Sequence, residues 1–159
     1  MSTEPKNIPC IAEGFCFSLY SAAHAMMKAY TPLLKEIGLT YPQYLVLFAL
    51  WEKDGQTVSD LGDTLFLDSG TLTPLLKRME KAGLVKRARS SADERVVQVT
   101  LTEKGRDLKV TGMEIARGFM CATGRTPEQV APLRIELNQV RDRLLKTVKK
   151  LETGANAKA

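Results

Sequence analysis

The fold is decided by residues 65–87, which read LFLDSGTLTPLLKRMEKAGLVKR. Asp68 is a favoured helix N-cap, and the apolar residues after it recur at steps of three and four until Gly83 ends the pattern. The spacing therefore predicts a helix that buries Leu72, Leu75, Leu76 and Met79. A shorter helix is predicted just before it, because Thr57 and Asp60 form a capping-box pair. Two short helices joined by a tight connection are typical of a helix-turn-helix.

The hydrophobic period changes after this helix. Residues 84–90 and 95–101 are interpreted as two strands, because Val97, Val99 and Leu101 alternate with polar residues in the second. The polar residues 91–94 predict the turn between the strands. A β-hairpin directly after a helix-turn-helix is the order of a winged helix-turn-helix.

Amphipathic helices are predicted on both sides of this unit. Residues 14–37 carry an apolar stripe in which Pro32 is a place for a kink, and Thr40 caps a further helix that begins the winged unit. Near the other end, Thr126 precedes a helix with a long apolar stripe. That stripe consists of Val130, Leu133, Leu137, Val140, Leu144, Val148 and Leu151.

We therefore expect one mainly α domain over residues 1–159, with a small β-hairpin wing. The winged helix-turn-helix takes up about residues 40–102, and dimerisation helices flank it at about 14–37 and 103–152. The seam of the last helix is about 32 Å long, which is more than one small domain needs. We expect these helices to form a two-fold homodimer, although packing within one chain is the open alternative.

Composition excludes several classes of protein. The chain has 159 residues and no apolar run near the roughly 18 residues of a membrane span, and from its first residues we expect no secretory signal. Three cysteines and one His, without a Cys-x-x-Cys pair, argue against a disulfide framework and a structural zinc site, and no cofactor is indicated. We expect a cytoplasmic protein with reduced thiols. The formal net charge of +5 favours an anionic partner.

The positive charge gathers on the predicted helix-turn-helix and hairpin. Residues 77–95 hold seven basic and three acidic residues, so this segment alone carries +4 of the net charge. A solvated surface is the plain alternative, but cations on this motif favour double-stranded DNA, with hydroxyls at base edges and cations at phosphates. The residues expected to face DNA are Ser69, Thr71, Thr73, Lys77, Arg78, Lys81, Arg89 and Arg95. Pro74 should clash with the carbonyl four residues earlier, so either the first turn of this helix is irregular or the regular helix starts near Thr73.

The first helix carries a candidate redox centre. Cys16 and Tyr30 share its apolar stripe but are about 21 Å apart along the axis, so they meet only if two first helices cross antiparallel in a dimer. Tyr41 joins them from the next helix. Tyrosine hydroxyls that donate to a thiolate stabilise it, and the thiolate is the form that attacks peroxide. On spacing alone, the alternative is that Cys16 is a small buried apolar residue.

Three segments resemble one family of proteins. The run DERVVQVTLTEKG at residues 93–105 resembles the wing signature of MarR-type transcriptional repressors. The segment GFCFSLYSAAHAM at residues 14–26 and the opening stretch at 65–87 are similar to the organic-hydroperoxide-sensing OhrR branch of that family. The resemblance implies that Asp93 orients Arg95 within the wing, from which a cation reaches the minor groove.

The resemblance also implies a redox chemistry. Cys16 matches the peroxide-reactive cysteine of the OhrR branch, and Tyr30 and Tyr41 match the tyrosines that bond to it across the dimer. Cys121 matches the second cysteine of two-cysteine members. We then expect Cys16 to form a sulfenic acid that condenses with Cys121 of the partner subunit.

The resulting prediction is a repressor rather than an enzyme. It binds a palindromic DNA operator as a homodimer while Cys16 is reduced, and it leaves when an organic hydroperoxide oxidises that thiol. One alternative is a MarR-type repressor gated by a small aromatic ligand in the dimer crevice. The other is a thiol peroxidase. No membrane or metal partner is expected.

Overall fold

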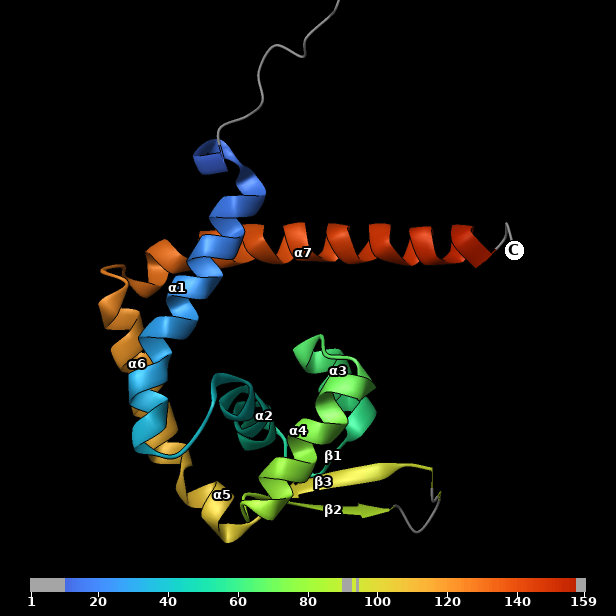
Figure 1. The fold of residues 1–159 in the computed structure, drawn as a ribbon. Helices are drawn as coiled ribbons and strands as arrows, with labels where there is room; N and C mark the ends of the chain where they lie inside the picture. The colour runs from blue at the N-terminus through green and yellow to red at the C-terminus, as the bar shows by residue number, and fades with distance from the viewer. Residues whose placement is uncertain (1–10, 90–92, 94, 157–159) are drawn as a thin grey trace, which may run out of the picture. The chain divides into compact units, whose positions relative to one another are not determined.

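A computed structural model describes residues 11–89, 93 and 95–156 of the chain (Figure 1). The chain divides into two compact units, of which one ends at Ala116 and the other begins at Arg117. The described elements are mainly helical with one small sheet, as the sequence predicts. The assignment of one domain with parts at about 40–102, 14–37 and 103–152 stays a prediction.

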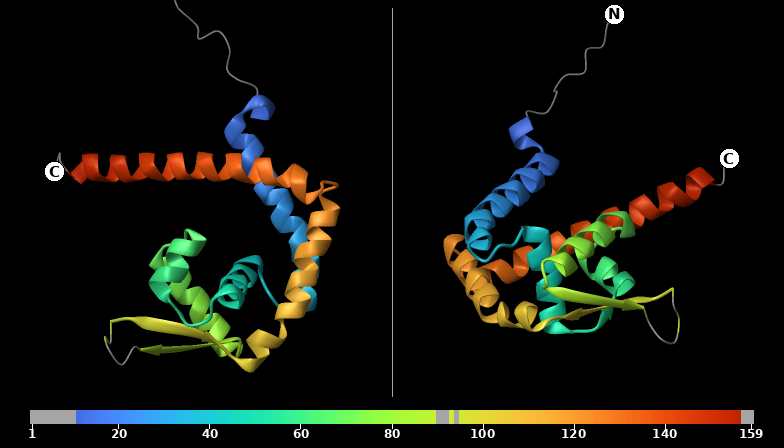
Figure 2. Two further views of the ribbon diagram at one scale, coloured as in Figure 1. Left: turned by 180° about the vertical axis from the view of Figure 1, so that it is seen from behind. Right: turned by 60° about the horizontal axis from the view of Figure 1, so that its bottom comes forward.

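The first unit contains a winged helix-turn-helix. Its elements in chain order are α2 (Tyr41–Glu52), β1 (Gln56–Thr57), α3 (Val58–Leu65), α4 (Ser69–Lys81), β2 (Val85–Arg89) and β3 (Val97–Leu101). The sheet is antiparallel in the order β1-β3-β2. Figure 2 shows α2, α3 and α4 gathered on one face of this sheet. Strand β1 was not predicted, because two residues are too short to show an alternating pattern.

Side-chain caps start the helices where the sequence places them. The backbone N–H of Thr40 donates to Oε1 of Gln43 at 2.8 Å at the start of α2. At the start of α3, the backbone N–H of Asp60 donates to the Thr57 hydroxyl, and the backbone N–H of Thr57 donates to the Asp60 carboxylate, both at 3.1 Å. The predicted capping boxes are confirmed, and they fix the two helices that precede α4.

The core of the winged unit lies between the helices and the sheet. All four residues predicted to be buried on α4 are buried, because their spacing puts them on one side of the helix. Fully buried side chains of the neighbouring helices and strands belong to the same core, namely Leu47, Leu50, Leu61, Val85 and Val99. Burying several aliphatic side chains at about 1.5–3 kcal/mol each gives this unit its own stability.

Three further helices border the winged part. Helix α1 (Phe15–Glu36) runs through Pro32 without interruption. After β3, the chain forms α5 (Glu103–Asp107) and then α6 (Lys109–Ala122), a division that the sequence analysis did not anticipate. A Cβ on Gly105 would overlap the backbone carbonyl of Leu84, so α5 needs a glycine where it packs against the chain before β2.

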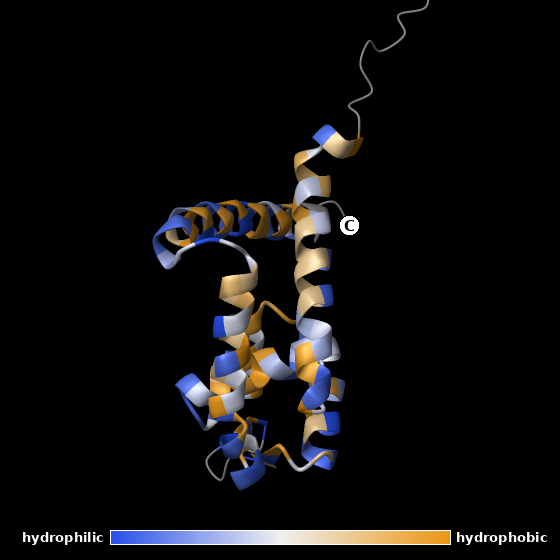
Figure 3. Ribbon diagram, turned by 90° about the vertical axis from the view of Figure 1, so that its left-hand side faces the viewer, coloured by the Kyte–Doolittle hydropathy of each residue, from blue (hydrophilic) through white to orange (hydrophobic). Residues whose placement is uncertain are grey.

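Helix α7 (Pro127–Asn156) makes up most of the second unit. It begins with the predicted capping box, in which the backbone N–H of Thr126 donates to Gln129 Oε1 at 3.1 Å and the N–H of Gln129 donates to the Thr126 hydroxyl at 3.4 Å. Figure 3 shows hydrophobic segments that recur along this helix between hydrophilic ones. Several leucines of the predicted stripe are exposed, including Leu137, Leu144 and Leu151.

Candidate nucleic-acid interface and thiol site

The first turn of α4 is fixed by Asp68. Its carboxylate accepts hydrogen bonds from the backbone N–H of Thr71 at 2.9 Å and from the Thr71 hydroxyl at 3.0 Å. These two bonds hold the pKa of Asp68 below its usual value, so the cap is charged at neutral pH. A negative charge is favourable at the positive end of the helix dipole. Thr71, which is predicted to face DNA, therefore also holds the cap.

The side of α4 opposite the core is exposed and basic. Among the residues predicted to face DNA, Thr73 is half-buried and the others on this helix are exposed, namely Ser69, Thr71, Lys77, Arg78 and Lys81. Hydroxyls stand on the first turns and cations on the later ones. This order suits a helix whose N-terminal end approaches base edges while its later turns approach phosphates.

The structure answers the question about Pro74. Helix α4 begins at Ser69 and includes Pro74 at its sixth position, so the helix does not start near Thr73. Pro74 has no N–H to donate to the carbonyl of Gly70. The ring of Pro74 is exposed, on the surface shared with Lys77.

The wing places two cations beside the turn. Arg89 ends β2 and Arg95 precedes β3, and both are exposed. Oδ1 of Asp93 accepts the backbone N–H of Arg95 at 2.9 Å, and the Asp93 carbonyl accepts the N–H of Val96 at 2.9 Å. Asp93 thus shapes the backbone that presents Arg95. The other predicted turn residues, 91, 92 and 94, lie outside the described residues.

One of the basic residues counted in the sequence pairs within the fold. Arg87 Nη2 lies 2.8 Å from Glu80 Oε2, and its Nε and backbone N–H donate to the same carboxylate at 2.9 and 3.0 Å. These bonds hold the pKa of Glu80 below its usual value. Arg87 therefore joins β2 to the end of α4, and its charge is largely balanced by Glu80.

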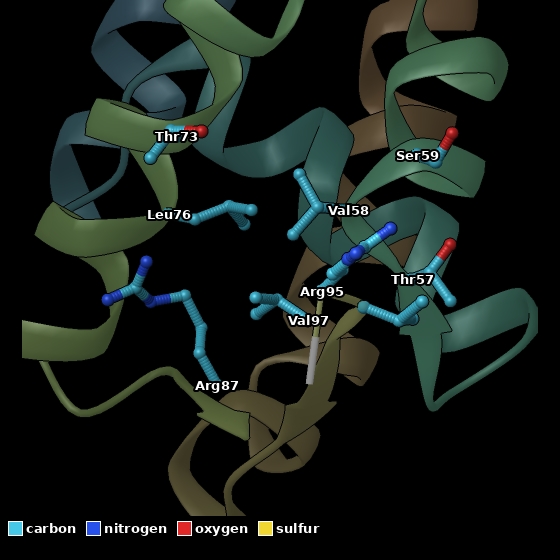
Figure 4. Close-up of a pocket in the computed structure, with 9 residues that line it drawn as sticks. Thr57, Val58, Ser59, Thr73, Leu76, Arg87, Arg95 and Val97 are labelled. Carbon is cyan, nitrogen blue, oxygen red and sulfur yellow. The ribbon is translucent and has the colours of Figure 1, made fainter. Parts of the chain in front are cut away.

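A cleft of about 350 Å³ opens between α3, α4 and the wing (Figure 4). The side chains that line it are Thr57, Val58, Ser59, Thr73, Leu76, Arg87, Arg95, Val96 and Val97. Figure 4 shows Arg87 on the α4 side of the cleft and the Arg95 guanidinium near Val58 of α3. The cleft combines apolar walls with cationic groups at the edge of the basic surface.

Three tyrosines form a cluster where α1 meets α2. The ring centroids of Tyr30 and Tyr41 are 5.0 Å apart, and those of Tyr30 and Tyr44 are 5.9 Å apart. The Tyr41 hydroxyl donates to Sδ of Met26 at 3.9 Å, and the Tyr44 hydroxyl donates to the Gly112 carbonyl at 3.0 Å. Tyr44 was not among the predicted site residues, because a tyrosine inside an apolar run looks like an ordinary core residue.

Burial keeps these phenols protonated. Burial, with smaller contributions from Tyr44 and Tyr41, raises the pKa of Tyr30 to about 12. Burial also raises the pKa of Tyr41 and of Tyr44 above the ordinary value. Each hydroxyl is therefore a neutral hydrogen-bond donor across the physiological range.

The two described thiols are exposed. Cys16 lies in the first turn of α1, and Cys121 lies in the last turn of α6. The alternative of Cys16 as a buried apolar residue is therefore wrong for the single chain. Cys16 and Tyr30 lie on one continuous helix, about 21 Å apart along its axis, so they do not meet within the chain. Cys10 lies outside the described residues.

Large apolar side chains are exposed on both terminal helices. Phe15 and Tyr20 on α1 are 59% and 66% exposed, and Leu144 and Leu151 on α7 are 57% and 67% exposed. Apolar surface of this extent marks a protein–protein interface more often than free surface. Within the described parts of the chain, no helix is both long and apolar enough to cross a membrane, and no three potential metal ligands gather.

Residues 28–111 match the family model described as transcriptional regulator SarA/Rot. The chain is 50% identical over 129 residues to the HTH-type transcriptional regulator TtmR of Methylorubrum extorquens. That match covers 81% of this chain and 66% of the relative, just under two thirds of its length. It is 46% identical over 122 residues to the organic hydroperoxide resistance transcriptional regulator of Bacillus subtilis, covering 77% of this chain and 83% of that protein.

Solved structures of the regulator AbfR superpose on this chain. AbfR of Staphylococcus epidermidis superposes with a TM-score of 0.73 at 36% identity, covering 86% of this chain and 94% of that one. Overoxidised AbfR bound to DNA superposes with a TM-score of 0.72 at 38% identity, covering 84% and 94% of the two chains. AbfR with its disulfide formed gives 0.64 at 37% identity, covering 85% and 92%.

Proposed function

The chain belongs to the SarA/Rot family of MarR-like, winged-helix transcriptional regulators, and from this premise we propose that it is a redox-sensing repressor of the organic-hydroperoxide type. It binds operator DNA while Cys16 is reduced and leaves when that thiol is oxidised. The observation that carries the proposal is the exposure of Cys16 and Cys121 at two helix ends. The relative AbfR has been solved in reduced, overoxidised and disulfide forms.

Operator binding rests on the basic face of α4 and on the wing. The exposed hydroxyls and cations of α4 enter the major groove, and Arg89 or Arg95 reaches the minor groove beside it. AbfR has been solved bound to DNA in the reduced form, which supports operator binding by a reduced protein of this fold. Two copies then read a palindromic operator with half-sites about 34 Å apart.

Dimerisation rests on the exposed apolar faces of the terminal helices. The stripe of α7 presents Leu137, Leu144 and Leu151 to solvent in the single chain, and α1 presents Phe15 and Tyr20. A second copy of the chain covers these side chains in a two-fold arrangement, which also supplies the two reading heads that a palindrome needs.

The sensing reaction begins at Cys16. Its thiolate attacks the outer oxygen of an organic hydroperoxide, the O–O bond breaks, and an alcohol leaves as Cys16 becomes a sulfenic acid. The thiol of Cys121 of the partner subunit then attacks this sulfur, so that a disulfide forms and water leaves. The two steps consume one hydroperoxide and two thiols.

Tyr30 and Tyr41 prepare the thiolate. They form one cluster, and burial keeps both hydroxyls as neutral donors. Because Cys16 does not reach Tyr30 on its own helix, the bonds form between Cys16 of one copy and the tyrosines on α1 and α2 of the other. The weak Tyr41 bond to the Met26 sulfur at 3.9 Å is then exchanged for a stronger bond to a charged sulfur.

The variant Cys16→Ser tests the proposal, with Cys121→Ser beside it. Operator retention is measured in a gel before and after an organic hydroperoxide is added. We expect Cys16→Ser to bind DNA like wild type and to stay bound after treatment. If Cys16→Ser is released as readily as wild type, the sensor assignment is wrong.

The same proteins separate the alternatives. A repressor gated by a small aromatic ligand would be released by that ligand in both serine variants, without oxidation. A thiol peroxidase would consume many equivalents of hydroperoxide with a thiol reductant, whereas the sensor consumes about one per Cys16 before reduction.

A further inference from the structure

We propose that Tyr44 is a positioning residue that couples α6, the helix carrying Cys121, to the DNA-reading unit. The inference rests on the proposed redox function and adds the route by which oxidation reaches α4. Tyr44 lies on α2, and its buried hydroxyl donates to the Gly112 carbonyl of α6 at 3.0 Å. Cys121 follows nine residues later on the same helix.

The crossing of α2 and α6 is close at this point. A Cβ on Gly112 would overlap the Trp51 ring and would lie 3.4 Å from the Tyr44 ring. Tyr44 and Trp51 themselves pack edge to face, with ring centroids 6.1 Å apart. This close approach holds the Tyr44 hydroxyl at the Gly112 carbonyl. Packed helices can still slide past one another by a small amount, and the hydrogen bond is what resists that sliding of α6 along α2.

Hydrogen bonds also hold the C-terminal end of α2 to the chain around α5 and α6. Trp51 Nε1 donates to the Gly105 carbonyl at 2.9 Å, and the Lys109 ammonium donates to the Trp51 carbonyl at 3.2 Å. Helix α2 is therefore fastened at two places, about two turns apart, to the segment that leads to Cys121. The Tyr44 bond is the one of these that joins the body of α6.

The other side of α2 contacts the reading unit. Helix α2 packs against α3, α4 and β3, and Leu47 and Leu50 on it are fully buried. Gln56 of β1 adds two bonds, because its side-chain amide donates to the carbonyls of Ala49 and Lys53, both at 2.9 Å. A movement of α2 is therefore passed on to the recognition helix and the sheet.

Tyr44 also touches the tyrosines proposed to stabilise the thiolate. Its ring centroid is 5.9 Å from that of Tyr30 and 6.3 Å from that of Tyr41. One buried side chain thus contacts the sensing tyrosines, α6 and the core of the reading unit. The Tyr44→Phe substitution keeps all the ring contacts and removes only the bond to Gly112, so it isolates the coupling.

The test compares Tyr44→Phe with wild type and with Thr111→Val. Thr111 is exposed on α6 beside Gly112, so the control also removes a hydroxyl but leaves the Tyr44 bond in place. Three quantities are measured for each protein: operator affinity when reduced, the extent of disulfide formation with an organic hydroperoxide on a non-reducing gel, and operator affinity when oxidised. A thermal unfolding curve establishes that each variant is folded.

We expect Tyr44→Phe to bind the operator like wild type when reduced and to form the disulfide to the same extent. The loss of affinity on oxidation should be about tenfold smaller than in wild type, as the removal of one buried hydrogen bond suggests. Thr111→Val should respond like wild type.

The inference is overturned if Tyr44→Phe loses as much affinity on oxidation as wild type does. It is also overturned if reduced Tyr44→Phe already fails to bind, since the hydroxyl then serves the resting fold rather than the coupling. If oxidised wild type keeps its full affinity, the proposed function has failed. That result is distinct from a failure of Tyr44→Phe alone.

Discussion

The ring centroids of Tyr30 and Tyr41 lie 5.0 Å apart, although the two residues belong to different helices. Tyr30 is buried and Tyr41 is half-buried. The Tyr41 hydroxyl donates its hydrogen bond to the Met26 thioether, which is a weak acceptor. Two neutral donors are thus held side by side, at a distance from the cysteine of their own chain. This arrangement is suited to receiving an anion from a second copy.

Replacement of either tyrosine by phenylalanine should slow oxidation of Cys16. Each change removes one donor to the thiolate, and hydrogen bonds to charged groups contribute about 1.5–3 kcal/mol. We expect Tyr30→Phe and Tyr41→Phe each to lower the rate of sulfenic acid formation by roughly tenfold, measured by trapping in a Cys121→Ser background. If both variants form the sulfenic acid at the wild-type rate, the two tyrosines do not stabilise the thiolate.

The raised pKa of Tyr30 predicts a loss of stability in alkali. Between its ordinary value of 10 and its value of about 12 in the fold, the unfolded chain releases the Tyr30 proton while the folded chain keeps it. The free energy of unfolding therefore falls as the pH rises through this range. Urea unfolding is measured at neutral pH and at about pH 11. Between these two pH values, the free energy of unfolding should fall less for Tyr30→Phe than for wild type. An equal fall in the two proteins would contradict the prediction.

Removal of a cation from α4 should weaken operator binding and flatten its salt dependence. Lys77 and Lys81 are exposed on the face opposite the core. Each lost phosphate contact lowers the slope of log affinity against log salt by about 0.9. Lys28→Ala on α1 removes the same charge elsewhere and serves as the control. If the slope of log affinity against log salt is the same for Lys77→Ala as for Lys28→Ala, the DNA-binding surface does not lie on α4.

The cap at Asp68 should matter both for stability and for DNA binding. Asp68→Ala removes the acceptor for both Thr71 bonds, so we expect the melting temperature to fall by about 2–4 °C and operator affinity to fall with it. Asp68→Asn retains a good N-cap and should stay close to wild type. Calorimetry and a binding titration check the pair, and an alanine variant indistinguishable from the asparagine variant would refute the capping role.

A charge on the apolar stripe of α7 should dissociate the dimer. Leu144 is 57% exposed in the single chain, and a glutamate there would be buried without a partner in the proposed interface. Sedimentation should show monomers for Leu144→Glu and dimers for Gln139→Glu, which adds the same charge at another exposed position of the helix. A stable Leu144→Glu dimer would place the interface elsewhere.

Much of the winged unit could be predicted, because its signals are local. The caps at Thr40, Thr57 and Asp68 and the buried stripe of α4 follow from residues within one or two helical turns. Strand β1 could not be predicted, since two residues show no period and its pairing with β3 is formed across a long stretch of sequence. The break between α5 and α6 could not be predicted either, because the residue at the break, Leu108, is neither a glycine nor a proline.

The candidate site was less accessible from sequence. The cations of α4 and the wing are correctly placed on the surface, but only the fold shows that Arg87 is held by Glu80. Tyr30 and Tyr41 were paired by resemblance, whereas Tyr44 was missed because its role depends on the Gly112 carbonyl, 68 residues away. Contacts of this range depend on packing, which a local pattern does not report.

The central claim is that oxidation of Cys16 releases the operator. The most direct measurement titrates the operator-bound protein with less than one equivalent of an organic hydroperoxide and follows two quantities in each sample: the fraction of Cys16 oxidised, by mass spectrometry, and the fraction of operator released. The account predicts that the two fractions rise together and that a thiol reductant reverses both. Full oxidation of Cys16 with the operator still bound would contradict it.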